Sequence, residues 1–199
     1  MARPRSAGFE LQREQMLAAA AKLFASRGYT ATTMTEVAAA CGVSKATLYH
    51  YITDKHALLA QITRGHVARL EQLVLAVHLL GLPPQAQLQE LILRFMQVYA
   101  QAQSEHRVLT EDLKFLDEAD RSAVKAGQRR VVAAFADAIA LLRPDLRGAQ
   151  LHTPMAMLLF GMMNWTFTWL REGGALTHAS LAPRVVQLFL GGLPAVQMR

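Results

Sequence analysis

The densest group of side chains with hydrogen-bonding chemistry lies between residues 44 and 55 of this 199-residue chain. It offers hydroxyl, ammonium, imidazole and phenol groups, from Ser44, Lys45, Thr47, Tyr49, His50, Tyr51 and Lys55. Such groups donate hydrogen bonds to phosphate oxygens and to base edges. Ala46 adds a methyl group, which can contact an apolar part of a base edge. This group of side chains favours recognition of a nucleic acid.

The flanking residues predict two short helices joined by a tight turn. Thr33 and Glu36 form a capping box, which starts the first helix. Gly42 ends it, because glycine tolerates the left-handed conformation that closes many helices. Ser44 is a good N-cap for the second helix. In that second helix Leu48 must face inward, so the polar side chains are left to face outward.

The second helix, Lys45 to Tyr51, allows two interpretations. In a helix-turn-helix motif it would enter the major groove of DNA, with Lys45 and Ala46 at the base edges. The phosphates would then be held by Thr33, Ser44, Thr47, Tyr49, Tyr51 and Lys55, with His50 beside them. The alternative is a solvated corner between two helices, because the same geometry also occurs without DNA.

Residues 13 to 59 resemble the N-terminal DNA-binding domain of the TetR family of transcriptional regulators. The matching positions are Ala20, Leu23, Phe24, Gly28, Tyr29, Thr32, Thr33, Ala38, Gly42, Val43, Ser44, Thr47, Leu48, Tyr49, Lys55 and Leu58. Ile52 departs from the phenylalanine that is usual in the family, but an aliphatic side chain can fill the same small core. The resemblance implies an all-α fold, in which a three-helix helix-turn-helix domain (residues 9–69) is joined by a long helix to a helical effector-binding and dimerisation domain (residues 70–199).

Composition and charge fit this expectation. Hydrophobic residues make up 52% of the chain, which is ample for a core, and the formal charge is +6. Residues 1–71 carry nine Lys or Arg against five Asp or Glu, which suits a polyanionic partner. Arg3 and Arg5 could reach DNA from a loose N-terminal arm, or the arm could have no role.

Neither secretion nor membrane insertion is expected. Cys41 is the single cysteine, so it cannot form an intrachain disulfide, and the first residues lack the apolar run of a signal peptide. The longest apolar stretch, Met155 to Met163, is about half of the ~20 residues that a membrane span needs. We expect a cytoplasmic protein that has no membrane partner.

Helical periodicity extends along the whole chain, and no stretch alternates as a strand would. A first helix is expected from Leu11 to Arg27, and a fourth helix capped by Thr53 or Asp54 and running toward Leu80. The fourth helix could be a mechanical connector between the domains or a rigid strut. Further helices are expected at 85–103, 106–116, 118–142, 150–171 and 179–191. Pro183 implies that the last helix starts near Ala182 or kinks there.

The C-terminal half is rich in methionine and aromatic residues, which can line a pocket for an apolar ligand or fill an ordinary core. The resemblance implies an effector site between its helices and a dimer formed by the last two long helices. The candidate effector-binding residues are Met96, Tyr99, Leu113, Phe135, Met163 and Phe167.

A pattern between residues 160 and 177 narrows the effector class. Gly161, Asn164, Trp165, Trp169, Gly174 and Thr177 resemble a pattern found in a subset of TetR-type regulators of fatty-acid, steroid and aromatic-acid breakdown, whose effectors are commonly acyl-CoA thioesters. Trp165 and Trp169 would share one face of a helix. A dimer interface and a pocket both explain such a pair, and we favour the interface because interface cores are enriched in aromatic side chains.

No pattern in the chain indicates an enzyme or a cofactor. The acidic clusters lack metal-ligand spacing, and there is no nucleophile elbow and no phosphate-binding glycine loop. The prediction is a homodimeric transcriptional repressor that binds a pseudo-palindromic DNA site and is released by an apolar effector. The alternatives are a helical acyl-CoA or lipid-binding module that does not bind DNA, and a ligand-dependent activator.

Overall fold

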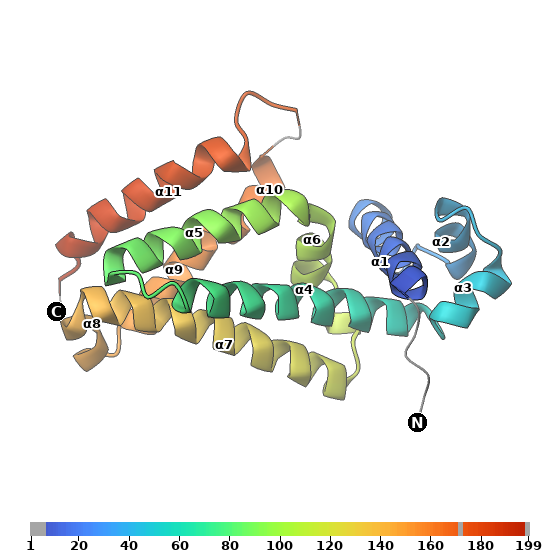
Figure 1. Cartoon of the computed structure of the whole chain (residues 1–199), viewed down its shortest axis with the longest axis horizontal. Coiled ribbons are helices and arrows are strands. Elements are labelled where there is room, and N and C mark those ends of the chain that lie inside the picture. The colour runs from blue at the N-terminus through green and yellow to red at the C-terminus, as the bar shows by residue number, and fades with distance from the viewer. Residues whose placement is uncertain (1–6, 171–172, 198–199) are drawn as a thin grey trace. The chain divides into compact units, whose positions relative to one another are not determined.

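The structure is a computed structural model that describes residues 7–170 and 173–197 (Figure 1). Within these ranges every regular element is a helix, as the sequence predicts, and none is a strand. Arg3 and Arg5, predicted to lie in an N-terminal arm, are outside the described residues. No helix in the described ranges is both long enough and apolar enough to cross a bilayer.

The first three helices are α1 (Ala7–Arg27), α2 (Met34–Ala40) and α3 (Lys45–Tyr51). The predicted capping box starts α2, because the Glu36 amide donates to Thr33 Oγ1 and the Thr33 amide donates to the Glu36 carboxylate. Gly42 follows α2 with φ +66°, the left-handed conformation that the turn requires. Leu48 of α3 is fully buried, whereas the remaining residues of this helix keep exposed surface.

Helix α4 (Lys55–His78) is capped by Asp54, whose carboxylate accepts the amide of Ala57 at 2.7 Å. The elements that follow it are α5 (Pro84–Gln101), α6 (Gln103–Glu111), the short 3-10 helix η1 (Leu113–Phe115), α7 (Glu118–Leu142) and α8 (Pro144–Gly148). The α7 bounds are those predicted. Helix α8 was not predicted, because Pro144 and Gly148 indicate a loop when they are considered singly.

The helix predicted over residues 150–171 is instead two helices, α9 (His152–Asn164) and α10 (Thr166–Trp169). The break has a local cause, because hydroxyls take up main-chain carbonyls where the helix would continue. Thr166 Oγ1 donates to the carbonyl of Met163 at 2.7 Å, and Thr168 Oγ1 donates to that of Trp165 at the same distance. Such bonds offer the backbone an alternative to a regular helix.

The last helix, α11 (His178–Gly192), is followed by the 3-10 helix η2 (Leu193–Ala195). It starts at a second capping box, in which Ser180 and Thr177 exchange amide-to-hydroxyl hydrogen bonds. Pro183 therefore lies inside the helix, and the expectation of a start near Ala182 is wrong.

The chain divides into two compact units, which do not follow the predicted boundary at residue 69. The first unit contains the chain up to His66 together with Ser104–Val124. The second contains Val67–Gln103 and the chain from Lys125 onward. Helices α4 and α7 therefore contribute residues to both units. The assignment of residues 9–69 and 70–199 to two functional domains stays a prediction.

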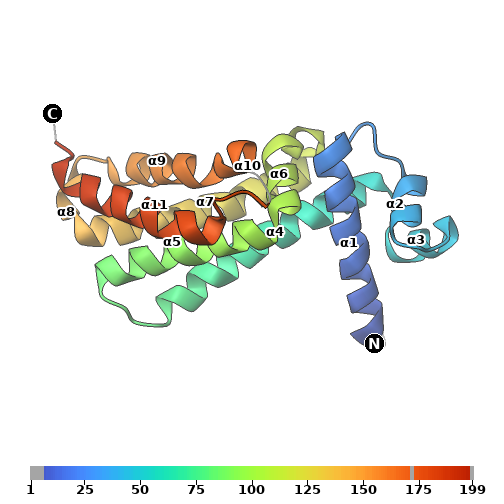
Figure 2. The same cartoon turned by 90° about the horizontal axis from the view of Figure 1, so that it is seen from above.

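The core of the second unit is built from α4, α5, α7, α9 and α11, and α5 lies alongside α11 (Figure 2). Phe95, Phe135 and Phe160 meet at its centre. The Phe135 ring is 4.8 Å from each of the other two, in the tilted and edge-to-face arrangements that aromatic quadrupoles favour.

Candidate nucleic-acid interface and effector region

The α1–α2 turn and α3 together present the predicted DNA-contacting side chains within the first unit. Ser44 caps α3 by accepting the amide of Thr47 at 3.0 Å, and the hydroxyls of these two residues lie 2.8 Å apart. Lys45 and Ala46 are exposed at the first turn of α3, where a recognition helix contacts bases. Tyr49 is 43% exposed, and the Lys45 ammonium lies 5.8 Å from its ring centroid.

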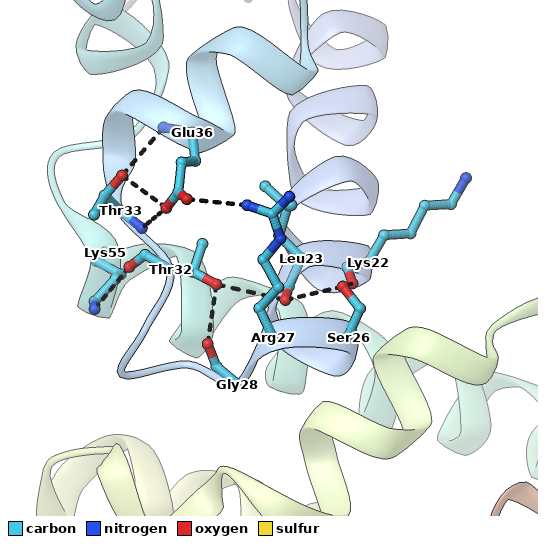
Figure 3. A network of polar contacts seen from close by, with 9 residues as sticks. All are labelled: Lys22, Leu23, Ser26, Arg27, Gly28, Thr32, Thr33, Glu36 and Lys55. Atoms are coloured by element: carbon cyan, nitrogen blue, oxygen red, sulfur yellow. Dashed lines mark hydrogen bonds and ion pairs between the residues drawn. The ribbon is translucent and has the colours of Figure 1, made fainter.

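A polar network fixes the start of α2 (Figure 3). The Glu36 carboxylate accepts from the amide and hydroxyl of Thr33 and forms an ion pair with Arg27. The hydrogen bonds from Thr33 lower the pKa of Glu36 below its ordinary value. One residue earlier, Thr32 Oγ1 donates to the carbonyl of Gly28 at 2.9 Å. Thr33 itself is exposed, and both of its donors are bound to Glu36 in this structure, so its contact with a phosphate stays a prediction.

Lys55 has a different environment from the one predicted. Its ammonium donates to the carbonyls of Tyr29, Thr30 and Thr32 at 3.0, 3.2 and 2.9 Å. An ammonium has three N–H donors, so none remains for a phosphate in this conformation. The ammonium also lies 4.7 Å from the Tyr29 ring centroid. The structure therefore gives Lys55 a role in holding the α1–α2 turn, and its contact with a phosphate stays a prediction.

Tyr51 is half-buried and its phenol has a protein partner, so the expectation that it faces outward is corrected, whereas its contact with a phosphate stays a prediction. Its hydroxyl donates to Gln12 Oε1 at 2.5 Å, and its ring stacks on Phe9 at 4.3 Å. Both partners belong to α1, so Tyr51 attaches the end of α3 to the start of α1. His50 stays exposed, with its ring edge-on to both Phe9 and Tyr51.

The predicted effector-binding residues do not all lie in one unit. Leu113, in η1, belongs to the first unit. The other five belong to the second, where four are buried in the core and Phe167 is half-buried in α10. The four core residues are Met96, Tyr99, Phe135 and Met163.

Tyr99 brings a polar group into this core. Its hydroxyl donates to Asn164 Oδ1 at 2.8 Å, so Asn164 provides a hydrogen-bond partner for this buried phenol. Burial raises the pKa of the Tyr99 phenol well above its ordinary value, so the group stays a neutral donor. The amide of Asn164 and the phenol of Tyr99 therefore link α9 to α5 at the end of both helices.

Trp165 and Trp169 are 65% and 48% exposed, so the described chain does not bury either of them. They extend an apolar surface that includes Met157 and Leu158 of α9 and Leu188 of α11, all more than half exposed. Because α9 contacts both α10 and α11, we interpret these side chains as one exposed apolar face, called here the face of α9 and α11. Whether this face is an interface or part of a pocket stays a prediction.

A group with metal-ligand atoms also appears in the first unit, although the sequence spacing did not indicate it. His56, Asp117 and Asp120 bring one ligand atom each within 4.8 Å of one another. Protein groups already account for this arrangement, because His56 Nε2 accepts the amide of Asp117 at 3.1 Å and Arg64 forms an ion pair with Asp120. We therefore interpret it as a polar contact between α4 and α7.

Comparisons with known proteins agree with the helix-turn-helix and the helical second unit described above. Residues 16–62 match the family described as bacterial regulatory proteins, tetR family, and residues 81–193 match the tetracyclin repressor-like C-terminal domain. The chain belongs to the TetR family. It is thus a helix-turn-helix regulator of transcription. One match covers α2 and α3, called here the reading helices, and the other covers most of the second unit.

Two solved structures extend the likeness across nearly the whole TetR-type chain. A TetR-family transcriptional regulator from Bordetella parapertussis 12822 is 36% identical, with a TM-score of 0.84, and the match covers 94% of this chain and 98% of that one. AibR, solved in complex with isovaleryl coenzyme A and operator DNA, is 26% identical with a TM-score of 0.75 over 89% of this chain and 97% of AibR.

Among curated relatives, the HTH-type transcriptional repressor KstR2 of Rhodococcus jostii (strain RHA1) is 26% identical over 192 residues. That match covers 92% of this TetR-family chain and 91% of the relative. The similarity therefore includes the helical regulatory half as well as the DNA-binding half.

Proposed function

We propose that this TetR-family protein is a homodimeric repressor that binds double-stranded DNA and is released by an apolar effector such as an acyl-CoA thioester. The observation that carries the DNA part is the surface of α3, which buries only Leu48 and turns hydroxyl, ammonium and imidazole groups outward. Lys45 and Ala46 read base edges. Thr33, Ser44, Thr47, Tyr49 and His50 contact the phosphate backbone. The protein acts in the cytoplasm.

The exposed apolar face of α9 and α11 supports the homodimer. Its large side chains have no cover within the described chain, and contiguous exposed apolar surface of this kind marks interaction sites. In the dimer, two copies of α3 read a pseudo-palindrome whose half-sites lie on the same side of the duplex.

Two observations support an acyl-CoA effector. One is the pattern at residues 161–177, and the other is the similarity to AibR, which was solved with isovaleryl coenzyme A and operator DNA. The effector releases DNA only to the extent that it binds more tightly to the conformation with displaced reading helices. Five of the six candidate effector residues lie in the second unit, which also contains the part of α4 from Val67 onward.

The test of DNA binding is a randomised-site selection with the full-length protein, followed by titration of the selected duplex at fixed salt. Lys45→Ala should weaken binding by about 1–3 kcal/mol and relax the preference at one position of each half-site. Tyr49→Phe is the matched variant, and it should weaken binding to all DNA sequences by a similar factor because it removes a phosphate contact. Variants that both bind like the parent would contradict these roles.

The same experiment separates the alternatives. If no duplex is selected but isovaleryl-CoA or a longer acyl-CoA raises the melting temperature, the protein is a helical acyl-CoA-binding module. Duplex binding that requires the thioester would indicate an activator. Coenzyme A without an acyl chain is the control, because an effector recognised by its apolar part should give a larger shift than this control.

A further inference from the structure

The connection between α6 and α7 packs against the turn between α1 and α2, within the first unit. The ring of Phe115, in η1, stacks on the ring of Tyr29 with centroids 5.1 Å apart and planes 27° apart. Tyr29 directly follows Gly28, where α1 ends, and four residues later Thr33 caps α2. A residue from the middle of the chain thus contacts the turn that sets the position of the reading helices.

Tyr29 is in turn held by contacts with Phe24 and Lys55. The Tyr29 ring also lies edge-on to the buried Phe24, 5.2 Å away, and beneath the Lys55 ammonium. The same ammonium binds the carbonyls of Tyr29, Thr30 and Thr32 (Figure 3 shows the bond to Thr32). If Tyr29 shifts, the three carbonyls and the ammonium must shift with it. Those carbonyls immediately precede the capping residue of α2.

The α6–α7 connection also contacts the first turns of α4. The amide of Asp117 donates to His56 Nε2, and Asp120 pairs with Arg64. The connection therefore touches both the α1–α2 turn, through Tyr29, and the start of α4, through His56. Since α3 lies between these two points in the chain, the connection contacts the protein on either side of the recognition helix.

The covalent neighbours of the connection lead to the candidate effector residues. Tyr99 lies two residues before the end of α5, and α6 begins at Gln103. On the other side, α7 runs without a break from Glu118 to Leu142 and carries Phe135. The α6–α7 connection is therefore joined along the chain to the end of α5 on one side and to α7 on the other, which gives a displacement of either helix a covalent route to it.

We propose that Phe115 is a positioning residue that couples the effector region to the DNA-reading helices through its stack on Tyr29. This inference rests on the proposed function. With the stack formed, the turn at residues 28–33 is ordered and α2 and α3 are held ready for DNA. When the connection moves, the stack opens, the turn loosens and affinity for DNA falls. Coupling between sites is reciprocal, so DNA binding must in turn order the connection.

The test is hydrogen–deuterium exchange of the full-length protein, free and with its selected duplex. The variant is Phe115→Leu, which keeps an apolar side chain but removes the ring. The matched control is Lys114→Ala, in the same 3-10 helix. Lys114 is exposed and contacts only the ring of Phe115 among the aromatic side chains described.

In the free protein, Phe115→Leu should speed exchange at residues 28–34, far away in sequence, while Lys114→Ala leaves it unchanged. When the duplex is bound, residues 113–120 of the parent should become more protected from exchange, and the same residues of Phe115→Leu should not. Phe115→Leu should also bind DNA about 2–10-fold more weakly, as expected from the loss of one aromatic pair. In a double-mutant cycle, Tyr29→Leu and Phe115→Leu should be non-additive in DNA affinity.

Unchanged exchange at residues 28–34, or additive effects on affinity, would overturn the coupling role while leaving DNA binding intact. A variant that only melts at a lower temperature, with the same exchange pattern and affinity, would show that Phe115 serves stability alone. If no duplex binds the parent, the proposed function fails, and the free-protein arm still decides whether Phe115 orders the turn.

Discussion

At the α1–α2 turn, a single ammonium satisfies three carbonyl groups that no helix covers. Buried or half-buried carbonyls without a partner are costly, and hydrogen bonds from a charged donor are about twice as strong as neutral ones. The Lys55 ammonium thereby supplies the hydrogen bonds that these carbonyls would otherwise receive from backbone amides in a helix. Its charge serves the fold of the reading domain first, whatever DNA is present.

Lys55→Met should therefore lower the free energy of unfolding by about 1–3 kcal/mol, because three carbonyls lose a charged donor. Urea denaturation followed by circular dichroism measures this loss. Lys45→Met is the control, since Lys45 is exposed and its ammonium lies over the exposed Tyr49 ring, and this variant should change stability by less than about 0.5 kcal/mol. Equal stability of both variants would contradict this stabilising role of Lys55.

His178 gives the stability a pH dependence. It is the first residue of α11 and is 5% exposed, and burial lowers its pKa below the ordinary value of 6.5. Its folded-state pKa is below its unfolded one, so its contribution is complete above about pH 6.5 and is lost as the pH falls toward the folded-state value. Thermal unfolding from pH 8 to pH 5 should show the parent losing more stability than His178→Gln. Parallel curves would contradict this.

The chemistry of individual side chains was predictable only where it depends on near neighbours. Thr33, Ser44 and Leu48 behave as the sequence predicts, because a cap and an inward-facing leucine are set within one helical turn. Lys55 and Tyr51 do not, because their partners, Tyr29 and Gln12, are more than 20 residues away in the chain. Spacing carries no information about such contacts.

Among the elements, α4 and α7 approach each other closely within the second unit. A Cβ atom on Gly127 of α7 would lie 2.4 Å from Val67 Cγ1 of α4, nearer than two carbon atoms can pack. Next to this crossing, Arg130 of α7 forms an ion pair with Glu71 of α4. Gly127 is thus required by packing, although a helical glycine costs about 0.5–1 kcal/mol relative to alanine.

Gly127→Ala should destabilise the protein by about 1–3 kcal/mol through overpacking, despite the better helix propensity of alanine. Adding Val67→Ala should recover part of that loss by removing the clashing methyl. Gly65→Ala in α4 is the control, because its Cβ would meet nothing within 4 Å, and it should be neutral or stabilising. Chemical denaturation of the four proteins distinguishes these cases, and a neutral Gly127→Ala would show that the helices separate at no cost.

The helix pattern was largely predictable, and its errors have physical causes. Long apolar periodicity gave α1, α4, α5 and α7 to within a few residues. The single helix expected at 150–171 failed because threonine hydroxyls compete for its carbonyls, a choice that periodicity does not reveal. The helix expected at 179–191 agrees with α11 to within one residue at each end, and the capping box at Thr177 decides against the alternative start near Ala182 that Pro183 suggested.

At the scale of the whole molecule, the exposed face of α9 and α11 predicts self-association. Leu188→Glu should convert the dimer to a monomer, because it places a charge in an apolar interface. Leu79→Glu is the matched control, since Leu79 is even more exposed, at 83% against 69%, but follows α4 instead. Light scattering after size exclusion measures the mass. A dimeric Leu188→Glu, or a monomeric Leu79→Glu, would place the interface elsewhere.

The effector region was the least predictable part of the molecule. Methionine and aromatic residues were recognisable as apolar, but composition does not separate a pocket wall from a packed core, and Met96, Phe135 and Met163 are all fully buried. The compact grouping of residues 104–124 with the DNA-reading part was not foreseen either, because no local pattern reports which segment a distant one will pack against.

That grouping limits how such regulators can be recombined. A chimera that joins residues 1–66 of this chain to the regulatory half of a relative would leave behind Phe115, Asp117 and Asp120, and with them the surfaces that support Tyr29 and His56. A transplant that also carries residues 104–124 keeps those surfaces. The natural module for engineering new biosensors from this protein is therefore discontinuous in the chain.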